Sequence, residues 1–232
     1  MKAIYIIGFF CILGICSAQT SSLERNALWK EFLEIDSLVG QNEFDKGLLR
    51  AYNFEKKVRS KYPDLHSNIL IVKAHSYMKM GLKDSTNTYL DKAEVLINDH
   101  GLDTLKAYLY RQRGQSYVYK YDYKSSIPIY FEGLNFAKKH GNVGEEMMLL
   151  YEISIAYKDL QNKDSARFYI DKSLSIAKKE KSNKYIANCN TVIGSIERNK
   201  GNYLKAMEHY FEAYGFAKMV YGDTDETRIK YI

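Results

Sequence analysis

A long internal repeat runs through most of the chain and constrains its fold more than any other feature. Tyr77, Tyr117 and Tyr157 are spaced by 40 residues, and the next step reaches Glu197, the main exception. Each position is followed by small, large, small and aliphatic or alanine residues at fixed offsets. These four columns contain Thr86, Ser126, Ala166 and Ala206; Leu90, Tyr130, Ile170 and Tyr210; Ala93, Gly133, Ser173 and Ala213; and Ile97, Ala137, Ala177 and Ala217. Such self-similarity is typical of solenoids and other repeat arrays.

Each repeat is predicted to be a pair of helices. The columns follow one another at offsets of 4, 3 and 4 residues, which is the helical period. Turn residues divide the pairs, and Gly101 and Gly141 each follow a histidine where a left-handed residue would end a helix. Pro128 falls inside an expected second helix, so we expect that helix either to start late, near Ser125 or Ser126, or to kink. An imperfect copy precedes the four repeats, with Gly47, Ala51, Phe54 and Val58 in the size columns.

The pattern resembles the tetratricopeptide repeat. Three repeats carry parts of that signature: Ile193-Gly194 with Ala206, Tyr210 and Ala213; Gly114, Tyr117, Tyr130 and Gly133; and Ile153, Tyr157 and Ala166. The resemblance implies an all-α fold, a right-handed superhelical solenoid of about five antiparallel helix pairs over residues 19–226. The period of 40 exceeds the family's usual length of about 34 residues, and the signature proline after the second helix is absent.

The segment 1–18 is predicted to be a secretory signal peptide. Lys2 precedes an apolar run over residues 3–16, and Cys16-Ser17-Ala18 offers a cleavage site of small residues after Ala18. The run is shorter than the ~20 residues of a membrane-spanning helix. An uncleaved anchor and a lipoprotein signal at Cys16 are the alternatives. We therefore expect export through the inner membrane and a periplasmic or envelope-associated protein, with Cys189 as its single thiol.

The C-terminal residues 227–232 are predicted to begin a truncated further repeat, after a capping-box-like start at residues 223–226. A solenoid normally ends in a polar capping helix. Either the chain belongs to a longer protein, or a partner supplies the cap. The resemblance is closest to bacterial envelope signalling proteins, in which such repeats precede a membrane helix and a kinase or DNA-binding output.

Motifs for catalysis, metals and cofactors are missing from the sequence. The histidines form no HExxH motif or close cluster with cysteine, and GxSxG, P-loop and GxGxxG motifs do not occur. Cys189 lies in an apolar-patterned stretch, so burial is favoured over a nucleophilic pair with His209. The net charge of +6 is mild, and the lysine clusters fall near helix ends. We expect no enzyme, no cofactor, no metal and no direct nucleic-acid partner.

The remaining candidate site is the concave face that the resemblance assigns to the first helices. Side chains one turn apart, between the packing columns, are expected to line it, although they could instead be merely exposed or fill the interior. Tyrosine and arginine on this face are frequent binding hot spots. The candidates are Asn68, Ile71, His75 and Lys79; Tyr108, Arg111, Gln115 and Tyr119; Tyr151, Ile155 and Asp159; and Asn188, Thr191 and Arg198.

Two functional hypotheses follow. In the first, the chain is a non-catalytic interaction module whose concave face binds an extended peptide or a partner helix. In the second, it is the sensory repeat region of a longer signal-transducing receptor, whose output domain lies outside this sequence.

Overall fold

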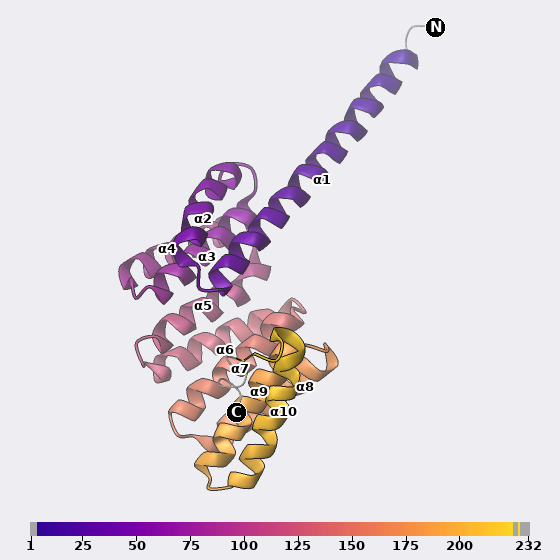
Figure 1. The fold of residues 1–232 in the computed structure, drawn as a ribbon. Coiled ribbons are helices and arrows are strands. Elements are labelled where there is room, and N and C mark those ends of the chain that lie inside the picture. Colours follow the sequence, from indigo (N-terminus) through magenta and orange to yellow (C-terminus); the bar gives the residue numbers. More distant parts are fainter. Residues whose placement is uncertain (1–3, 225–226, 228–232) are drawn as a thin grey trace. The chain divides into compact units, whose positions relative to one another are not determined.

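The chain is helical throughout its described part. The structure, a computed structural model, describes the backbone of residues 4–224 and 227 and the side chains of residues 22–224 and 227. No strand occurs among these residues. The helices form two compact units, residues 1–96 and 97–232, which are described separately (Figure 1). The expected all-helical repeat fold is confirmed.

The helices follow one another along the chain with short connections. Their bounds are α1 Ile4–Gly40, α2 Phe44–Val58, α3 Pro63–Lys79, α4 Lys83–Asp99, the 3₁₀ turn η1 Asp103–Leu105, α5 Lys106–Val118, α6 Tyr123–Lys139, α7 Val143–Asp159, α8 Lys163–Lys179, α9 Asn183–Asn199 and α10 Tyr203–Tyr221. The predicted signal peptide lies outside the residues whose side chains are described, as does most of the segment 227–232. In the part whose side chains are described, no helix combines the length and the hydropathy needed to cross a bilayer.

The turns between the helices explain the length of the repeat. Left-handed residues recur at even spacing, at positions 81, 101, 121, 141, 161, 181 and 201, one in each connection from α3–α4 to α9–α10. Glycine occupies four of these positions and Tyr121, Gln161 and Lys181 the others, with φ between 53° and 83°. Helices α3, α4 and α6 to α9 each have 17 residues, so two helices and two short turns of equal length complete one repeat. The longer period thus comes from longer helices with uniform turns.

Side-chain caps fix where several helices begin. The side chain of Asp122 accepts a hydrogen bond from the backbone N–H of Ser125, and Asn142 and Asn162 cap α7 and α8 in the same way. Each cap satisfies one of the free N–H groups in the first turn. Because Asp122 caps α6, the helix starts at Tyr123 and Pro128 lies in its second turn. Of the two alternatives for Pro128, the late start near Ser125 or Ser126 is therefore wrong.

The size columns of the repeat form the core. All sixteen residues of the four columns are buried except Tyr210, which is half-buried. The same holds for the imperfect first copy, in which Gly47, Ala51, Phe54 and Val58 are buried in α2. Glu197, the exception in the tyrosine series, is buried as well, where it accepts hydrogen bonds from Asn202 and Arg167. The periodicity therefore identified the packed faces correctly.

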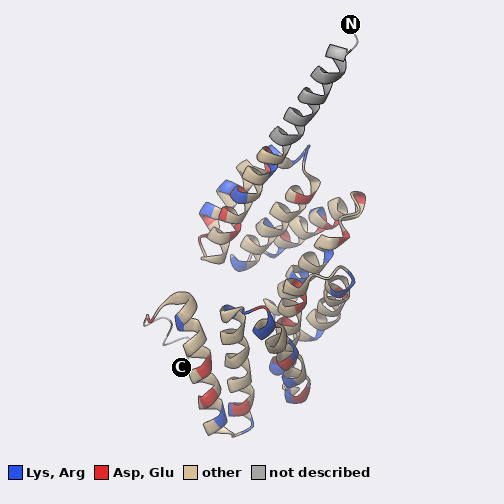
Figure 2. Ribbon diagram, turned by 90° about the vertical axis from the view of Figure 1, so that its right-hand side faces the viewer, with Lys and Arg blue, Asp and Glu red and all other residues tan. Residues whose placement is uncertain are grey.

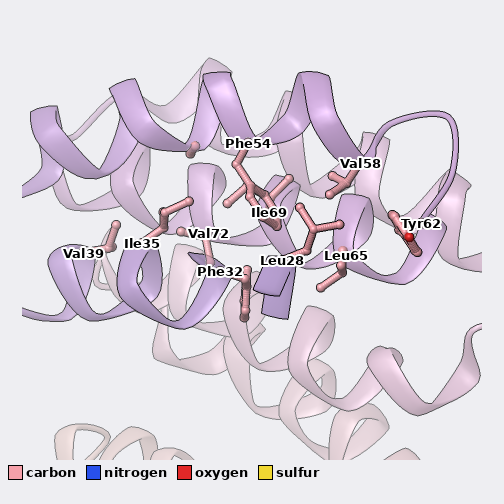
Figure 3. Close-up of a cluster of buried hydrophobic side chains, with 11 residues drawn as sticks. Leu28, Phe32, Ile35, Val39, Phe54, Val58, Tyr62, Leu65, Ile69 and Val72 are labelled. Atoms are coloured by element: carbon pink, nitrogen blue, oxygen red, sulfur yellow. The ribbon is translucent and has the colours of Figure 1, made fainter. Parts of the chain in front are cut away.

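The first unit has a core shared by α1, α2 and α3 (Figure 3). Helix α1 contributes Leu28, Phe32, Ile35 and Val39, whose spacing of three and four residues places them on one face. They pack against Phe54 and its neighbours in α2 and against Leu65, Ile69 and Val72 of α3. Burial of these large side chains holds the first helix pair to the first helix of the next pair.

The second unit stacks its helices in chain order. Each helix from α5 to α10 packs against its successor, and α5 also contacts α7, as α7 contacts α9. Tyr130, Leu149 and Ile153 form one cluster of its core, and Ile170, Cys189 and Ile193 belong to another. Basic and acidic residues are mixed along the helices of both units (Figure 2), and lysine pairs lie in the last turns of α2, α6 and α8 as expected.

Candidate functional site

The candidate residues of the second unit lie on α5, α7 and α9, with Tyr119 directly after the end of α5. We call the polar–aromatic face the surface formed by Tyr108, Arg111, Gln115 and Tyr119 together with Glu145, Tyr151, Glu152 and Tyr185. Tyr119 is exposed and Glu145 is buried, whereas the other side chains of this face are half-buried. Contacts between these side chains, which the sequence did not reveal, join each of the three helices to the next.

An ion pair joins α5 to α7. The Nε and Nη2 atoms of Arg111 donate to the two carboxylate oxygens of Glu145 at 2.7 and 3.1 Å. Both side chains are nearly buried, with 12% and 10% exposed. Burial acts to lower the pKa of Arg111, but the carboxylate of Glu145 outweighs it and raises that pKa. Glu145 neutralises Arg111 in a bidentate pair, so the guanidinium of Arg111 is already bound within the protein.

A second polar link lies beside the first. Gln115 Nε2 donates a hydrogen bond to Glu152 Oε1 at 2.7 Å. Gln115 Oε1 and the hydroxyl of Tyr130, both buried, have no hydrogen-bond partner among the described residues. Burial raises the pKa of Tyr130 strongly, the carboxylate of Glu152 adds to the rise, and Arg111 opposes it. Tyr130 therefore stays neutral, with its hydroxyl beneath the polar–aromatic face.

Aromatic rings join α7 to α9. The rings of Tyr151 and Tyr185 meet edge to face, with centroids 6.0 Å apart and an interplanar angle of 85°. Burial raises the pKa of Tyr185 to about 12, while Arg111 lowers it and the carboxylates of Glu152 and Glu145 raise it. The guanidinium carbon of Arg111 also lies 5.2 Å from the ring centroid of Tyr108. These charged and aromatic groups thus form one cluster across three helices.

The other candidates of the second unit are placed less centrally. Ile155 packs with Tyr151 against the buried cluster of α8 and α9. Asp159 pairs with Lys158 at 3.0 Å, and Thr191 donates to the carbonyl oxygen of Ala187 at 3.0 Å. Asn188 is half-buried and Arg198 is exposed. The sequence analysis missed Glu145, Glu152 and Tyr185, because only their contacts with other helices identify them as part of this face.

The candidates of α3 belong to the first unit, and two of them are misplaced by the sequence analysis. Asn68 and Ile71 are buried, so they do not line an open surface. The reason is that α3 is covered on nearly all sides, and every residue from Leu65 to Lys73 is buried. Helical spacing cannot define an open face on such a helix. His75 is half-buried and Lys79 is exposed.

The first unit contains a buried lysine that the sequence analysis missed. The side chain of Lys73 is 0% exposed and forms an ion pair with Glu55 of α2. Its Nζ lies 3.5 Å from the ring centroid of Tyr52, whose hydroxyl is 2.7 Å from the hydroxyls of both Tyr77 and Tyr89. Burial lowers the pKa of Lys73. A lysine at the end of the apolar run 69–72 was the only signal for this cluster.

The single thiol of the described part has no reactive environment. Cys189 is fully buried, its Sγ lies 3.5 Å from Ser173 Oγ, and burial raises its pKa to about 11. His209 instead contacts Asn190, with Nδ1 and Oδ1 3.0 Å apart. Among the described residues, no group of three or more His, Cys, Asp or Glu side chains is arranged to hold a metal ion. Burial of the thiol, as the sequence favoured, is confirmed.

The helix pairs form a tetratricopeptide-like helical-repeat fold, which comparison with solved structures supports. No family model and no curated protein matches the sequence. A signal-transduction ATPase with numerous domains from Pyrococcus horikoshii, which has a tetratricopeptide repeat sensor, matches with a TM-score of 0.67 and 17% identity. The match covers 82% of this chain and 29% of the ATPase.

Two further solved structures share the fold. BtubC (BKLC) from P. vanneervenii matches with a TM-score of 0.63 and 16% identity, over 90% of this chain and 92% of BtubC. The apo form of RapI matches with a TM-score of 0.66 and 14% identity, over 87% of this chain and 56% of RapI. The chain thus spans about half the length of RapI and less than a third of the ATPase. Identities this low establish the fold alone.

Proposed function

We propose that the chain is a non-catalytic protein-interaction module that binds an extended peptide or a partner helix on its polar–aromatic face. The observation that carries the proposal is the linkage of α5, α7 and α9 by the Arg111–Glu145 pair, the Gln115–Glu152 hydrogen bond and the Tyr151–Tyr185 contact. A surface fixed in this way loses little conformational entropy on binding. Tyrosines held at its edge are suitable anchors for a partner.

The charges of the face favour a partner with a basic side chain. Arg111 is the one cation among the eight residues that define the face, whereas Glu145 and Glu152 are both carboxylates. With two carboxylates and one guanidinium, these eight residues carry a net charge of −1. A lysine or arginine of the ligand would meet this negative charge among the tyrosine rings, which also attract cations. We therefore propose a peptide that presents a basic residue between hydrophobic ones.

A displayed library of random peptides tests this proposal. We expect the purified chain to enrich peptides with a basic residue, and Tyr108→Ala/Tyr119→Ala to weaken their binding more than about tenfold. Glu152→Gln should weaken basic peptides selectively. Tyr121→Ala is a matched control, because Tyr121 is an exposed tyrosine outside the face. Failure to enrich any peptide, or equal binding by the face variants and the control, would reject the assigned surface.

A sensory role in a longer protein is the second candidate. It is favoured by the fold shared with the ATPase from Pyrococcus horikoshii, in which such repeats are a sensor and of which this chain spans 29%. In that case the peptide would be a signal, and its binding would change the activity of an attached output domain. The coding sequence that follows Ile232 tests this candidate: a membrane-spanning segment with a kinase or DNA-binding region would support it, and an immediate stop codon would contradict it.

We also propose that the chain works outside the cytoplasm. The support is the sequence of residues 1–18, with Lys2, an apolar run and small residues before the cleavage site after Ala18. N-terminal sequencing of the protein recovered from an expressing cell's envelope fraction is the test. A new terminus at Gln19 would support export, and an intact Met1 on cytoplasmic protein would contradict it.

A further inference from the structure

An open pocket lies among α6, α7 and α8 of the second unit, lined by residues outside the polar–aromatic face. Its volume is about 310 Å³. The lining residues come from all three helices: Lys138 from α6, Glu146 and Leu150 from α7, and Lys172, Ser175 and Ile176 from α8. Leu150 is buried and Ile176 half-buried, whereas both lysines and the serine are exposed. An apolar floor with a few polar groups around it is the usual composition of a small-molecule site.

The repeat explains why space is left at this place. One repeat earlier, the rings of Tyr110 and Phe136 stack with their centroids 5.7 Å apart and an interplanar angle of 8°. The equivalent residues 40 positions later are Leu150 and Ile176, so two aliphatic side chains stand where two stacked rings would be. One repeat later the position of Ile176 is again a phenylalanine, Phe216, which packs against a buried cluster. The pocket therefore lies where the neighbouring repeats place an aromatic ring.

The rim of the pocket carries a net positive charge. Among the described residues, the side chains of Lys138, Lys172 and Glu146 form no hydrogen bond or ion pair, and the Nζ of Lys172 lies 4.1 Å from the ring centroid of Phe168. Two ammonium groups and one carboxylate leave a charge of +1 at the rim. A ligand with a single negative charge balances it, and the ammonium N–H groups can donate charge-assisted hydrogen bonds to that ligand.

We propose that this pocket binds a small monocarboxylic acid that carries an aromatic ring. The ring packs on Leu150 and Ile176 and restores the missing aromatic layer, while the carboxylate pairs with Lys138 and Lys172 at the rim. Glu146 repels a second negative charge, so the site selects a monoanion over a dicarboxylate. A volume of about 310 Å³ is at the lower end for small-molecule pockets, which suits one ring on a short chain.

Methyl NMR of the full chain tests the proposal, with hydrocinnamate as the probe. We expect the methyl resonances of Leu150 and Ile176 to shift and to saturate with a dissociation constant of about 0.1–1 mM, because the ligand is small and the rim is solvated. Hydrocinnamamide, which has the ring but no charge, should bind at least about fivefold more weakly. Butanoate, which has the charge but no ring, should not saturate the shifts. Absence of saturable shifts at these two residues, or equal affinity for the acid and the amide, overturns the proposal.

Variants of the floor and the rim test the two halves of the site separately. Ile176→Phe introduces the residue of the neighbouring repeats and should abolish binding of hydrocinnamate. Lys138→Met/Lys172→Met should weaken the acid at least about fivefold and leave the amide unaffected. Lys139→Met/Lys179→Met is the matched control, because it removes two exposed lysines from the same two helices outside the pocket. Equal weakening by the two lysine pairs would mean that only the net charge attracts the acid, and this result also overturns the proposal.

Discussion

The ring of Tyr130 occupies the space beside Gly114 that any larger residue would need. A Cβ on Gly114 would lie 2.4 Å from Tyr130 Cε1, closer than non-bonded atoms approach. Gly194 of α9 and Tyr210 of α10 repeat the arrangement at 2.7 Å. In both pairs a glycine on the first helix admits the ring from the second, which explains why glycine and tyrosine keep the same spacing in the two repeats.

Alanine at Gly114 should therefore destabilise the protein. The better helix propensity of alanine gives back up to about 1 kcal/mol, but overpacking against a fully buried ring costs roughly 1–3 kcal/mol. Tyr210 is only half-buried and its ring can move, so Gly194→Ala should cost less. Urea unfolding of both variants measures the difference. Equal losses of stability in the two variants would show that burial of the tyrosine ring does not determine the cost of the substitution.

Removing the hydroxyl of Tyr130 should leave the stability unchanged or increase it. That hydroxyl is buried without a hydrogen-bond partner in the described part of the chain, and such a group costs about 1–3 kcal/mol. Tyr130→Phe keeps the ring against Gly114 and removes the unpaired group. Tyr77→Phe is the matched control, because it loses the hydrogen bond to Tyr52 and should cost about 0.5–1.5 kcal/mol. A large loss in Tyr130→Phe would reveal a buried water on the hydroxyl.

The left-handed turn positions offer a direct test of backbone strain. Gln161 has a φ of 61°, whereas Gly141 occupies the same turn position one half-repeat earlier with a φ of 65°. A residue with a side chain pays about 1–2 kcal/mol in this conformation. Gln161→Gly should therefore raise the free energy of unfolding by up to about 1 kcal/mol, after the greater chain entropy of glycine is subtracted.

The reverse substitution is the control for the turn. Gly141→Ala should lower the free energy of unfolding, and no atom within 4 Å of the added Cβ complicates the comparison. Thermal unfolding of both variants is sufficient to rank them. A loss of stability in Gln161→Gly would mean that the glutamine side chain contributes more than the backbone strain removes.

Replacing one partner of the Arg111–Glu145 pair should destabilise the protein more than replacing both. Both side chains are nearly buried, with 12% and 10% exposed, so Arg111→Met leaves an unpaired carboxylate between α5 and α7. We expect a loss of about 3–5 kcal/mol for either single Met variant. The double variant Arg111→Met/Glu145→Met should recover most of that loss, since no charge is left buried. Additive losses in the double-mutant cycle would contradict the coupling.

Alkaline pH should destabilise the fold. Burial raises the pKa of Tyr77 and of Tyr185 to about 12 and that of Cys189 to about 11. The unfolded chain loses these protons first, so it binds fewer protons than the folded chain between pH 9 and pH 12. The stabilisation from these protonated groups should thus be complete below pH 9, and the free energy of unfolding should fall as the pH rises through that window. Urea midpoints measured against pH for the parent and Tyr185→Phe test this, because the variant should show a shallower fall. An identical slope would contradict the assignment.

The core could be predicted from the sequence, whereas much of the candidate surface could not. The size columns are buried because residues three and four apart share a face of a helix, whatever that helix packs against. The position of an open face is a weaker inference, since it depends on how many neighbours surround the helix. Asn68 and Ile71 show this, because α3 is covered where helical spacing alone suggested a groove. In α5 and α7, by contrast, Tyr108, Arg111, Gln115 and Tyr151 lie in one cluster whose contacts only the structure shows.

By itself, the sequence determined the helix pairs, their constant period and their buried faces, because these follow from local periodicity and from the size of each residue. The tertiary structure decided which distant side chains meet. Arg111 and Glu145 are 34 positions apart, and Tyr52 and Tyr89 are 37 apart. Their contacts depend on the rotation of each helix about its own axis and on its distance from its neighbours. Packing of the whole unit sets both quantities, so no spacing along the chain encodes them.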